Sequence, residues 1–255
     1  MTTVLKLGGS VVTEKDEPES VDEASLAGAA DAVVGSGGGD LVVVHGGGSF
    51  GHHHAANHDV STTRGTHDPT AVADVHGAMK RLNRRVVDAF LARDVAAVPV
   101  HPLSLCARDE RGSLSLPAGS VETLLGEGFV PVLHGDLVAH RGEGTTVVSG
   151  DELVTTLAAA LDADRVGLCS TVPGILDAAG DVVPRVETYE AVAGLLGGAE
   201  TTDVTGGMAG KVRQLLDLGA PAFVFGLDGL GAFLAGEDVG TRIDGRGSGA
   251  ADDGT

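Results

Sequence analysis

Residues 41–58 read LVVVHGGGSFGHHHAANH, in which an apolar run leads directly into a histidine and three glycines. An unbroken apolar run that ends in a glycine turn is typical of a parallel strand buried on both faces. The same pattern recurs along the chain, which predicts an open, mainly parallel sheet. The further segments are TVLKLGGS at 3–10, VAAVPVHP at 95–102, FVPVLHGD at 129–136, RVGLCSTVPG at 165–174 and APAFVFGLDG at 220–229.

Helical patterns lie between these strands. Residues 20–37 offer Ser20 as an N-cap, and residues 149–164 open with Ser149 and Glu152 at capping-box spacing. Residues 74–94 place apolar side chains on one stripe, which we expect to be buried and partly to line a pocket. Residues 185–198 and 207–220 are two further expected helices. The stripe consists of Val75, Met79, Leu82, Val86 and Phe90. An α/β protein of this kind binds its ligands beyond the carboxyl ends of the strands.

The composition is strongly acidic, with 36 Asp and Glu residues against 17 Lys and Arg and a formal charge of −19. Such a surface repels itself unless salt screens it, so we expect a halophilic cytosol. No basic stripe favours nucleic acid, no apolar run approaches membrane-spanning length, and the first residues lack a signal-peptide pattern. Cys106 and Cys169 lie outside any CxxC spacing and are expected to be buried thiols in a reducing compartment. The prediction is a cytoplasmic protein.

The glycine loop after residue 45 allows three interpretations. Gly46, Gly48 and Gly51 match a dinucleotide GxGxxG, but Asp68, the acid nearest the required distance, lies in a turn-like segment. A metal site would have to use the histidines of 45–58, of which His54 and His58 have helical i, i+4 spacing. A phosphate cradle fits best, because glycine turns expose successive backbone N–H groups to an anion.

The lysines favour the phosphate interpretation. Lys6 and Lys15 lie on either side of the turn at Gly8–Gly9, and Lys211 follows the glycine-rich segment DVTGGMAG. Lys80, by contrast, is expected on a solvated helix face. The Lys211 segment is not a P-loop, because Thr205 stands where the first glycine is required. Ammonium groups beside glycine turns are what transfer of a phosphoryl group requires, since that transition state asks mainly for positioning and charge neutralisation.

These segments resemble the amino acid kinase superfamily and, within it, the isopentenyl phosphate kinases. The resemblance rests on KLGGS at 6–10, HGGGSFGH at 45–52, SGDEL at 149–153 and DVTGGMAGKV at 203–212, in matching order and approximate spacing. It covers the chain except the tail. It implies an αβα sandwich in a single domain. An acceptor-binding lobe would span 1–155, a nucleotide-binding lobe 156–244, and residues 245–255 would be frayed.

The resemblance also implies a reaction, in which isopentenyl phosphate and ATP give isopentenyl diphosphate and ADP within a mevalonate route to isoprenoids. It implies a homodimer, a halophilic archaeal source, and Mg²⁺ held mainly by the ATP phosphates rather than by protein ligands. The catalytic residues would be Lys6, Lys15, His52 and Asp151. ATP would be bound by Lys6, Gly8, Gly9, Ser10, Gly48, Thr171, Gly206, Gly207 and Lys211. The acceptor would be bound by Gly47, His52 and Gly150.

Two features depart from the family pattern. The chain reads STVPGIL at 170–176, with Thr171 and Pro173 where many relatives have an Asp-rich turn, so the nucleotide base is not assigned. His53 and His54 extend the usual single histidine. The spacing from the glycines selects His52 for the acceptor phosphate, and whether His53 or His54 shares this role stays open. Two rival functions stay open: a kinase of the same fold for another phosphate or phosphonate, such as fosfomycin, and a non-catalytic binder of nucleotide or oxyanion.

Overall fold

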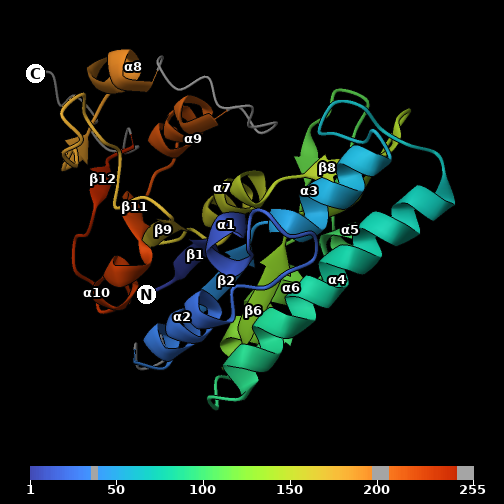
Figure 1. The fold of residues 1–255 in the computed structure, drawn as a ribbon, viewed down its shortest axis with the longest axis horizontal. Coiled ribbons are helices and arrows are strands. Elements are labelled where there is room, and N and C mark those ends of the chain that lie inside the picture. The colour runs from blue at the N-terminus through green and yellow to red at the C-terminus, as the bar shows by residue number, and fades with distance from the viewer. Residues whose placement is uncertain (36–39, 197–206, 246–255) are drawn as a thin grey trace, which may run out of the picture.

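The computed structural model describes residues 1–35, 40–196 and 207–245, with backbone alone for 195, 196 and 207–209. Within these residues, a sheet of eight strands runs through the molecule in the order β10-β12-β11-β9-β1-β2-β6-β3 (Figure 1). Neighbouring strands are parallel except β11 and β12. The six predicted strands are present as β1 (Thr3–Leu7), β2 (Leu41–His45), β3 (Ala97–Pro99), β6 (Val130–His134), β9 (Arg165–Ser170) and β11 (Ala222–Gly226). The remaining two are β10 (Arg185–Val186) and β12 (Thr241–Ile243).

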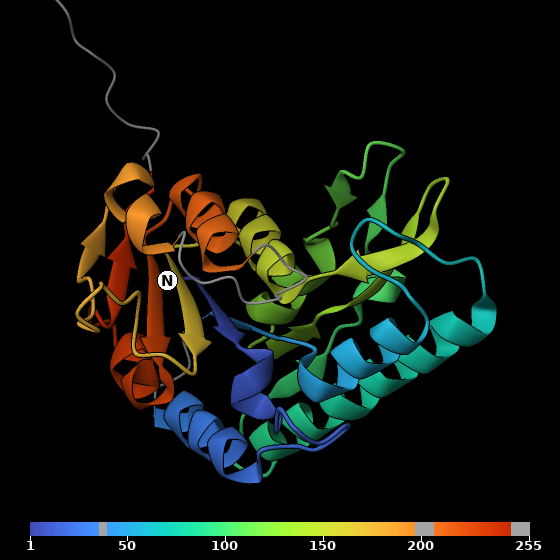
Figure 2. The ribbon, with the colours of Figure 1, turned by 45° about the horizontal axis from the view of Figure 1, so that its top comes forward.

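Helices cover both faces of this sheet, which gives three layers, αβα. One face packs against α1 (Gly9–Val12), α2 (Glu23–Gly35), the second half of α4 (Pro69–Leu91) and α10 (Leu230–Leu234), which follows the short 3-10 turn η1 (Leu227–Gly229). The other face packs against α6 (Gly119–Gly126), α7 (Gly150–Ala160), α8 (Glu190–Leu196) and α9 (Gly207–Leu216). In Figure 2 the blue α2 lies below the sheet and the orange α9 above it. Strand residues alternate between the two cores: Val4 faces one and Leu5 the other.

A smaller sheet and two helices extend the molecule beyond β6. The sheet has the order β5-β4-β7-β8 and comprises β4 (Ala107–Arg108), β5 (Leu114–Ser115), β7 (Asp136–His140) and β8 (Gly144–Val148). Helix α3 (Gly48–Asn57) packs along α4, and α5 (Pro102–Leu105) contacts β7. The apolar stripe of α4 is buried throughout, as predicted: Val75, Met79, Leu82, Val86 and Phe90 are at most 3 % exposed.

Two local predictions are wrong. Ser20 does not cap α2, because the carboxylate of Asp22 accepts from the backbone N–H of Ser25 at 2.9 Å and the helix begins at Glu23. Residues 185–198 are not one helix, because Arg185–Val186 pair with β12 and α8 begins only at Glu190. Ser149 does cap α7, accepting from Glu152 N–H at 3.1 Å. The tail expected to be frayed lies outside the described residues from position 246 onwards.

Burial accounts for the two cysteines. Cys106 and Cys169 are free and buried, and burial raises the pKa of each thiol to about 12. Neither thiol is therefore ionised near neutral pH, which fits a packing role for both. None of the described helices is both long and apolar enough to span a bilayer.

Candidate functional site

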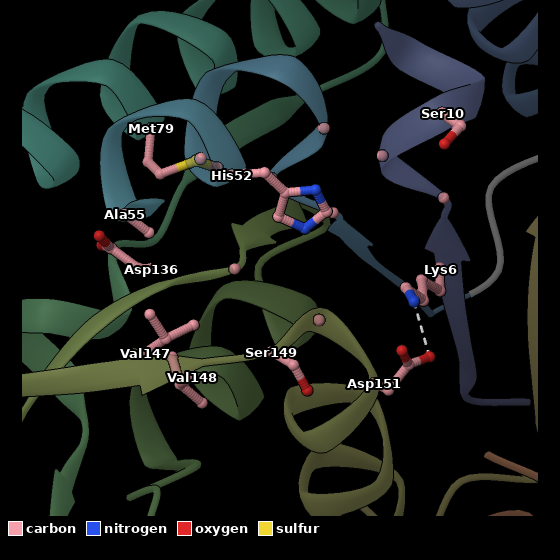
Figure 3. A pocket seen from close by; sticks show the side chains of 18 of the residues that line it. Lys6, Ser10, His52, Ala55, Met79, Asp136, Val147, Val148, Ser149 and Asp151 are labelled. Atoms are coloured by element: carbon pink, nitrogen blue, oxygen red, sulfur yellow. Dashed lines mark hydrogen bonds and ion pairs between the residues drawn. The ribbon is translucent and has the colours of Figure 1, made fainter. Parts of the chain in front are cut away.

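A cavity of about 910 Å³ opens at the carboxyl ends of β1, β2 and β9, where the sequence places its glycine turns. Its walls come from those turns, from α3 and α4, from β8 and from the first turn of α7. Figure 3 shows two unlike ends. Lys6 and Asp151 lie together at one end, Ala55 and Met79 lie at the other, and the imidazole of His52 stands between them.

Two lysines meet at one carboxylate in the polar end. Lys6 Nζ, from β1, lies 2.6 Å from Asp151 Oδ1, and Lys211 Nζ, from α9, lies 3.7 Å from Asp151 Oδ2. The side chains of Lys6 and Asp151 are 11 % and 10 % exposed. A carboxylate this buried needs cations beside it, and the two lysines supply them. Asp151 in turn holds both ammonium groups at the cavity wall. Two of the lysines that the sequence places beside glycine-rich segments, Lys6 and Lys211, thus lie at one carboxylate. Asp151 stands in the first turn of α7, where the helix dipole also favours an acid.

The two glycine turns press against each other so closely that no side chain fits between them. A Cβ on Gly9 would lie 2.5 Å from the backbone nitrogen of Gly48, and one on Gly46 would lie 2.5 Å from that of Gly9. Gly48 adopts a positive φ of 49°, and a Cβ there would lie 2.1 Å from Thr13 Oγ1. Glycine is thus required because any Cβ would clash with the neighbouring turn and because Gly48 has a positive φ. The backbone of these turns therefore faces the cavity without side chains.

Not every amide in these turns is available to a ligand. The N–H of Gly8 donates to Cys169 O at 2.9 Å, and the N–H of Gly46 donates to Leu7 O at 2.9 Å. Within the described part of the chain, the N–H groups of Gly9, Ser10 and Gly47 have no acceptor. Gly8 therefore shapes the turn, while its neighbours can offer N–H groups to an anion.

Most of the remaining sequence-predicted residues also line the cavity. Lys15 is exposed and stands in the loop between α1 and α2, on the cavity side. Gly150, Thr171, Gly47 and Gly48 line the same cavity. Gly207 begins α9, whereas Gly206 lies outside the described residues. Lys80 is exposed on α4, as expected of a solvated lysine.

The structure separates the clustered histidines by their partners. His52 lines the cavity from α3. His53 accepts from Asn57 Nδ2 at 3.1 Å on the exposed side of the helix. His54 lies between Asp74 and Glu19, and His58 also binds Asp74 at 2.8 Å. Of these histidines, His52 lines the cavity, whereas His54 and His58 share Asp74. Among the described residues, no group of three or more His, Cys, Asp or Glu could hold a metal ion.

The other end of the cavity is apolar and lies between α3, α4 and β8. Ala55 and Ala56 contribute from α3, Val75 and Met79 from α4, and Val147 from β8. Met79 Sδ packs beneath the glycine turn, because a Cβ on Gly51 would lie 2.9 Å from it. The small residues of α3 thus leave a space, and the larger residues of α4 form its opposite wall.

Two buried histidines shape the floor of the cavity. The ring Nδ1 of His45 donates to Gly46 O at 3.0 Å, and that of His134 donates to Gly135 O at 3.0 Å. Burial lowers the pKa of His45 to about 4, and it lowers the pKa of His134 well below its usual range. Both rings are therefore neutral near pH 7. Since C=O and N–H point in opposite directions across a trans peptide, the bond at Gly46 turns the N–H of Gly47 away from the ring.

Sequence reasoning missed this layer and the contributions of α3 and β8 to the apolar end, whereas the expectation that part of the α4 stripe lines a pocket is confirmed by Val75 and Met79. Asp136 lines the cavity while 3 % exposed, and it accepts from His76 Nδ1 at 2.8 Å. His101 Nδ1 lies 2.9 Å from His134 Nε2, so the half-buried rings of His76 and His101 continue the group of the buried Asp136 and His134. One signal was present: LHGD at 133–136 repeats the strand–His–Gly pattern of VHGG at 44–47.

Comparison with known proteins gives a consistent result. Residues 1–220 match the amino acid kinase family. An isopentenyl phosphate kinase of Haloferax volcanii is 65 % identical over 243 residues, which cover 95 % of this chain and 98 % of that protein. An isopentenyl phosphate kinase of Methanothermobacter thermautotrophicus is 34 % identical, covering 95 % and 99 %. A crystal structure of an isopentenyl phosphate kinase aligns with a TM-score of 0.80 at 27 % identity, covering 95 % of this chain and all of that one.

Proposed function

Because the chain belongs to the amino acid kinase family and within it to the isopentenyl phosphate kinases, we propose that it transfers the γ-phosphoryl group of ATP to isopentenyl phosphate. The products are isopentenyl diphosphate and ADP. One observation carries this assignment: a single cavity joins an end lined by lysines and bare amides to an apolar end between α3 and α4. The first suits two phosphates, and the second suits a short hydrocarbon tail.

The acceptor phosphate binds where the two ends meet. His52, the N–H of Gly47 and the N-terminus of α7 at Gly150 surround that position. A helix N-terminus and a free amide both favour an anion, and an imidazole N–H adds a bond to a charged oxygen. The tail then extends past Ala55 and Val147 toward Val75.

The transferring group lies between the acceptor and ADP. An acceptor phosphate oxygen forms the new bond to the γ-phosphorus, and the bond from that phosphorus to the β–γ bridging oxygen breaks, leaving ADP. The nucleophile is already an anionic oxygen, so no side chain needs to act as a strong base. Lys6 and Lys15 offset the charge on the transferring oxygens, and Asp151 holds Lys6 and Lys211 in place.

The nucleotide phosphates occupy the turns after β1 and β2. The N–H groups of Gly9 and Ser10 face this position, with Gly48 beside them and Gly8 shaping the turn. Lys211 and Gly207, at the start of α9, hold the phosphate end together with Gly206. Thr171, exposed after β9, lies on the nucleotide side.

Mg²⁺ enters with ATP in this proposal. The described residues do not fit a protein cage for it, because Asp151 is bound by two lysines and Asp136 by His76. A hard cation with few protein ligands is bound through substrate phosphates and water. No step of the mechanism above depends on a protein-bound metal.

Several broader assignments accompany this function. We assign the acceptor to a lobe at residues 1–155 and the nucleotide to a lobe at residues 156–244, with the nucleotide phosphates reaching the turns after β1 and β2 of the first lobe. The acidic composition and the similarity to a Haloferax volcanii protein support a halophilic cytosol. We include a homodimer and a place in a mevalonate route to isoprenoids in the proposal.

A coupled assay of ADP release in high salt tests the function. We expect turnover with isopentenyl phosphate to exceed turnover with fosfomycin. Preference for fosfomycin would favour a phosphonate kinase, and ATP binding without any turnover would favour a non-catalytic binder. The presence of both Lys6 and Lys15 argues against the binder, since binding alone does not require them.

A further inference from the structure

The loop that carries Lys15 is held at its base by Thr13. Thr13 donates to Gly9 O at 2.8 Å, and its Oγ1 accepts from Ser49 N–H at 3.0 Å. Thr13 also pairs with Val21 across the loop in a single antiparallel bridge. Lys15 itself lies beyond this base and is exposed, so the base alone does not fix where its ammonium group stands.

One side chain of the same loop contacts both α3 and α4, the two helices that line the apolar end. Glu19 has a positive φ of 53°, and its carboxylate accepts from Arg81 of α4 at 2.8 and 3.0 Å. The same carboxylate accepts from His54 Nε2 of α3 at 2.6 Å. A two-pronged bond from arginine fixes direction as well as distance. Glu19 thus ties the far side of the Lys15 loop to α3 and α4.

His54 joins the three elements through both ring nitrogens. Its Nδ1 lies 2.9 Å from Asp74 of α4, opposite the bond from Nε2 to Glu19. Both partners are carboxylate oxygens, which only accept, so each ring nitrogen carries a proton. The pKa of His54 is raised: burial lowers it, but the bonds to Asp74 and Glu19 outweigh that effect. The other nearby groups are His53, edge-on at a ring-centre distance of 5.3 Å, and His58 and Arg81, which share the two carboxylates.

We propose that Glu19, His54 and Arg81 form a clamp that positions Lys15 over the transferring phosphoryl group. The three are positioning residues, since they act through Lys15 and do not line the main cavity. The proposal rests on the proposed function for the identity of the reaction. The proposal also gives a role to His54, because the partners of His54 lie away from the acceptor phosphate.

The chain supplies a matched control. Two further arginines pair with acids of α2: Arg85 of α4 with Glu23, and Arg93, in the turn after α4, with Asp31. Like Arg81 and Glu19, each pair is separated by 62 positions, but both bind α2 rather than the Lys15 loop. Arg85→Gln therefore removes an equivalent exposed ion pair one helical turn along α4 and leaves the loop tethered.

A double-mutant cycle on the full-length protein tests the clamp. Turnover with isopentenyl phosphate is measured for wild type, Glu19→Gln, Lys15→Ala and the double variant, with Arg85→Gln alongside. We expect Glu19→Gln to lower kcat by about tenfold to a hundredfold, as a misplacement of about 1 Å does. We expect no further loss when Lys15 is already alanine. Independent, multiplying losses would overturn the clamp, as would an unchanged kcat in Glu19→Gln.

Hydrogen exchange of the backbone gives a second readout that needs no substrate. Amides of residues 14–21 should exchange faster in Glu19→Gln than in wild type, and at the wild-type rate in Arg85→Gln. Equal exchange in all three proteins would overturn the clamp even if the reaction were not the one proposed. Absence of turnover in wild type would refute the proposed function instead. If Glu19→Gln does not fold, His54→Gln takes its place in both experiments, with the same outcomes.

Discussion

The two ends of the cavity are built in different ways. The polar end gathers residues far apart in the chain, since Lys6, Asp151 and Lys211 come from β1, α7 and α9 and meet at one carboxylate. The apolar end is made by packing between neighbouring elements, with Ala55 of α3 opposite Val75 of α4 and Val147 of β8. Charge and bare backbone define the first end, and side-chain volume defines the second. The first end should therefore control turnover, and the second should control which acceptor is used.

The largest expected effect is at the polar end. Lys6→Ala removes the ammonium group that the proposed mechanism places next to the transferring phosphoryl, and it leaves Asp151 with one lysine fewer. We expect turnover to fall by about 10²–10³-fold, the loss typical of one group that stabilises transition-state charge. ATP affinity, measured by calorimetry, should change far less. Lys80→Ala, on the exposed face of α4, is the control and should leave both unchanged.

The floor beneath the polar end gives the next effect, on stability. His45 is fully buried with a pKa of about 4, against 6.5 for an unperturbed histidine. The folded state therefore resists protonation while the unfolded state accepts it, so stability is lost as pH falls below 6.5. The loss approaches about 3 kcal/mol near pH 4, from about 1.4 kcal/mol per pKa unit.

Chemical unfolding at fixed high salt, repeated between pH 7 and pH 4.5, measures this loss. His134 adds to it in the same direction, because burial also lowers its pKa. A His45→Phe variant should show a shallower decline over the same range. Identical slopes for the two proteins would mean that His45 is not neutral in the folded state.

His52 stands between the two ends, and its replacement sharpens the comparison. His52→Ala removes the proposed donor to the acceptor phosphate. The transition-state stabilisation measured by kcat/KM for the acceptor should therefore fall by about 1.5–3 kcal/mol, typical of a hydrogen bond to a charged group. ATP binding should be retained. His53→Gln should cost much less, because His53 bonds to Asn57. Similar losses of kcat/KM in both variants would show that the acceptor role is not specific to His52.

At the apolar end a smaller and more selective effect is expected. Ala55→Leu adds volume where the tail passes, so KM for isopentenyl phosphate should rise by about tenfold, in line with the 1–3 kcal/mol of overpacking. The KM for ATP should not change. Ala24→Leu, on the exposed face of α2, controls for adding a leucine to a helix surface. A parallel rise in both KM values would show that the two ends are not independent.

The sequence predicts the polar end better than the apolar end for a physical reason. Glycines and lysines at strand ends are local signals, and parallel strands bring their carboxyl ends to one edge. Lys6 and Gly9 could thus be placed at this edge before the structure was known, whereas Lys211, which lies in α9, was placed with them by the family resemblance. The strands at 107–108 and 114–115 are too short to show periodicity, so the small sheet was missed.

Long-range side-chain contacts were equally beyond reach of the sequence. Nothing local marks Glu19 as the partner of Arg81, 62 positions away, or His45 as a buried neutral ring. The N-cap of α2 shows that even a local feature can escape prediction from the sequence. Ser20 and Asp22 are both good caps by type, and only the path of the chain, with the N–H of Asp22 bonded to Val12 O, selects Asp22.

The most direct test compares isopentenyl phosphate with methyl phosphate as acceptors for the same enzyme. Both present a phosphate to the polar end, but only the first fills the apolar end. We expect kcat/KM to be lower for methyl phosphate by about two hundredfold, from about 0.8 kcal/mol for each of roughly four missing carbons. We expect Ala55→Leu to narrow this difference. Equal kcat/KM for the two acceptors would contradict the claim that one cavity reads phosphate at one end and hydrocarbon at the other.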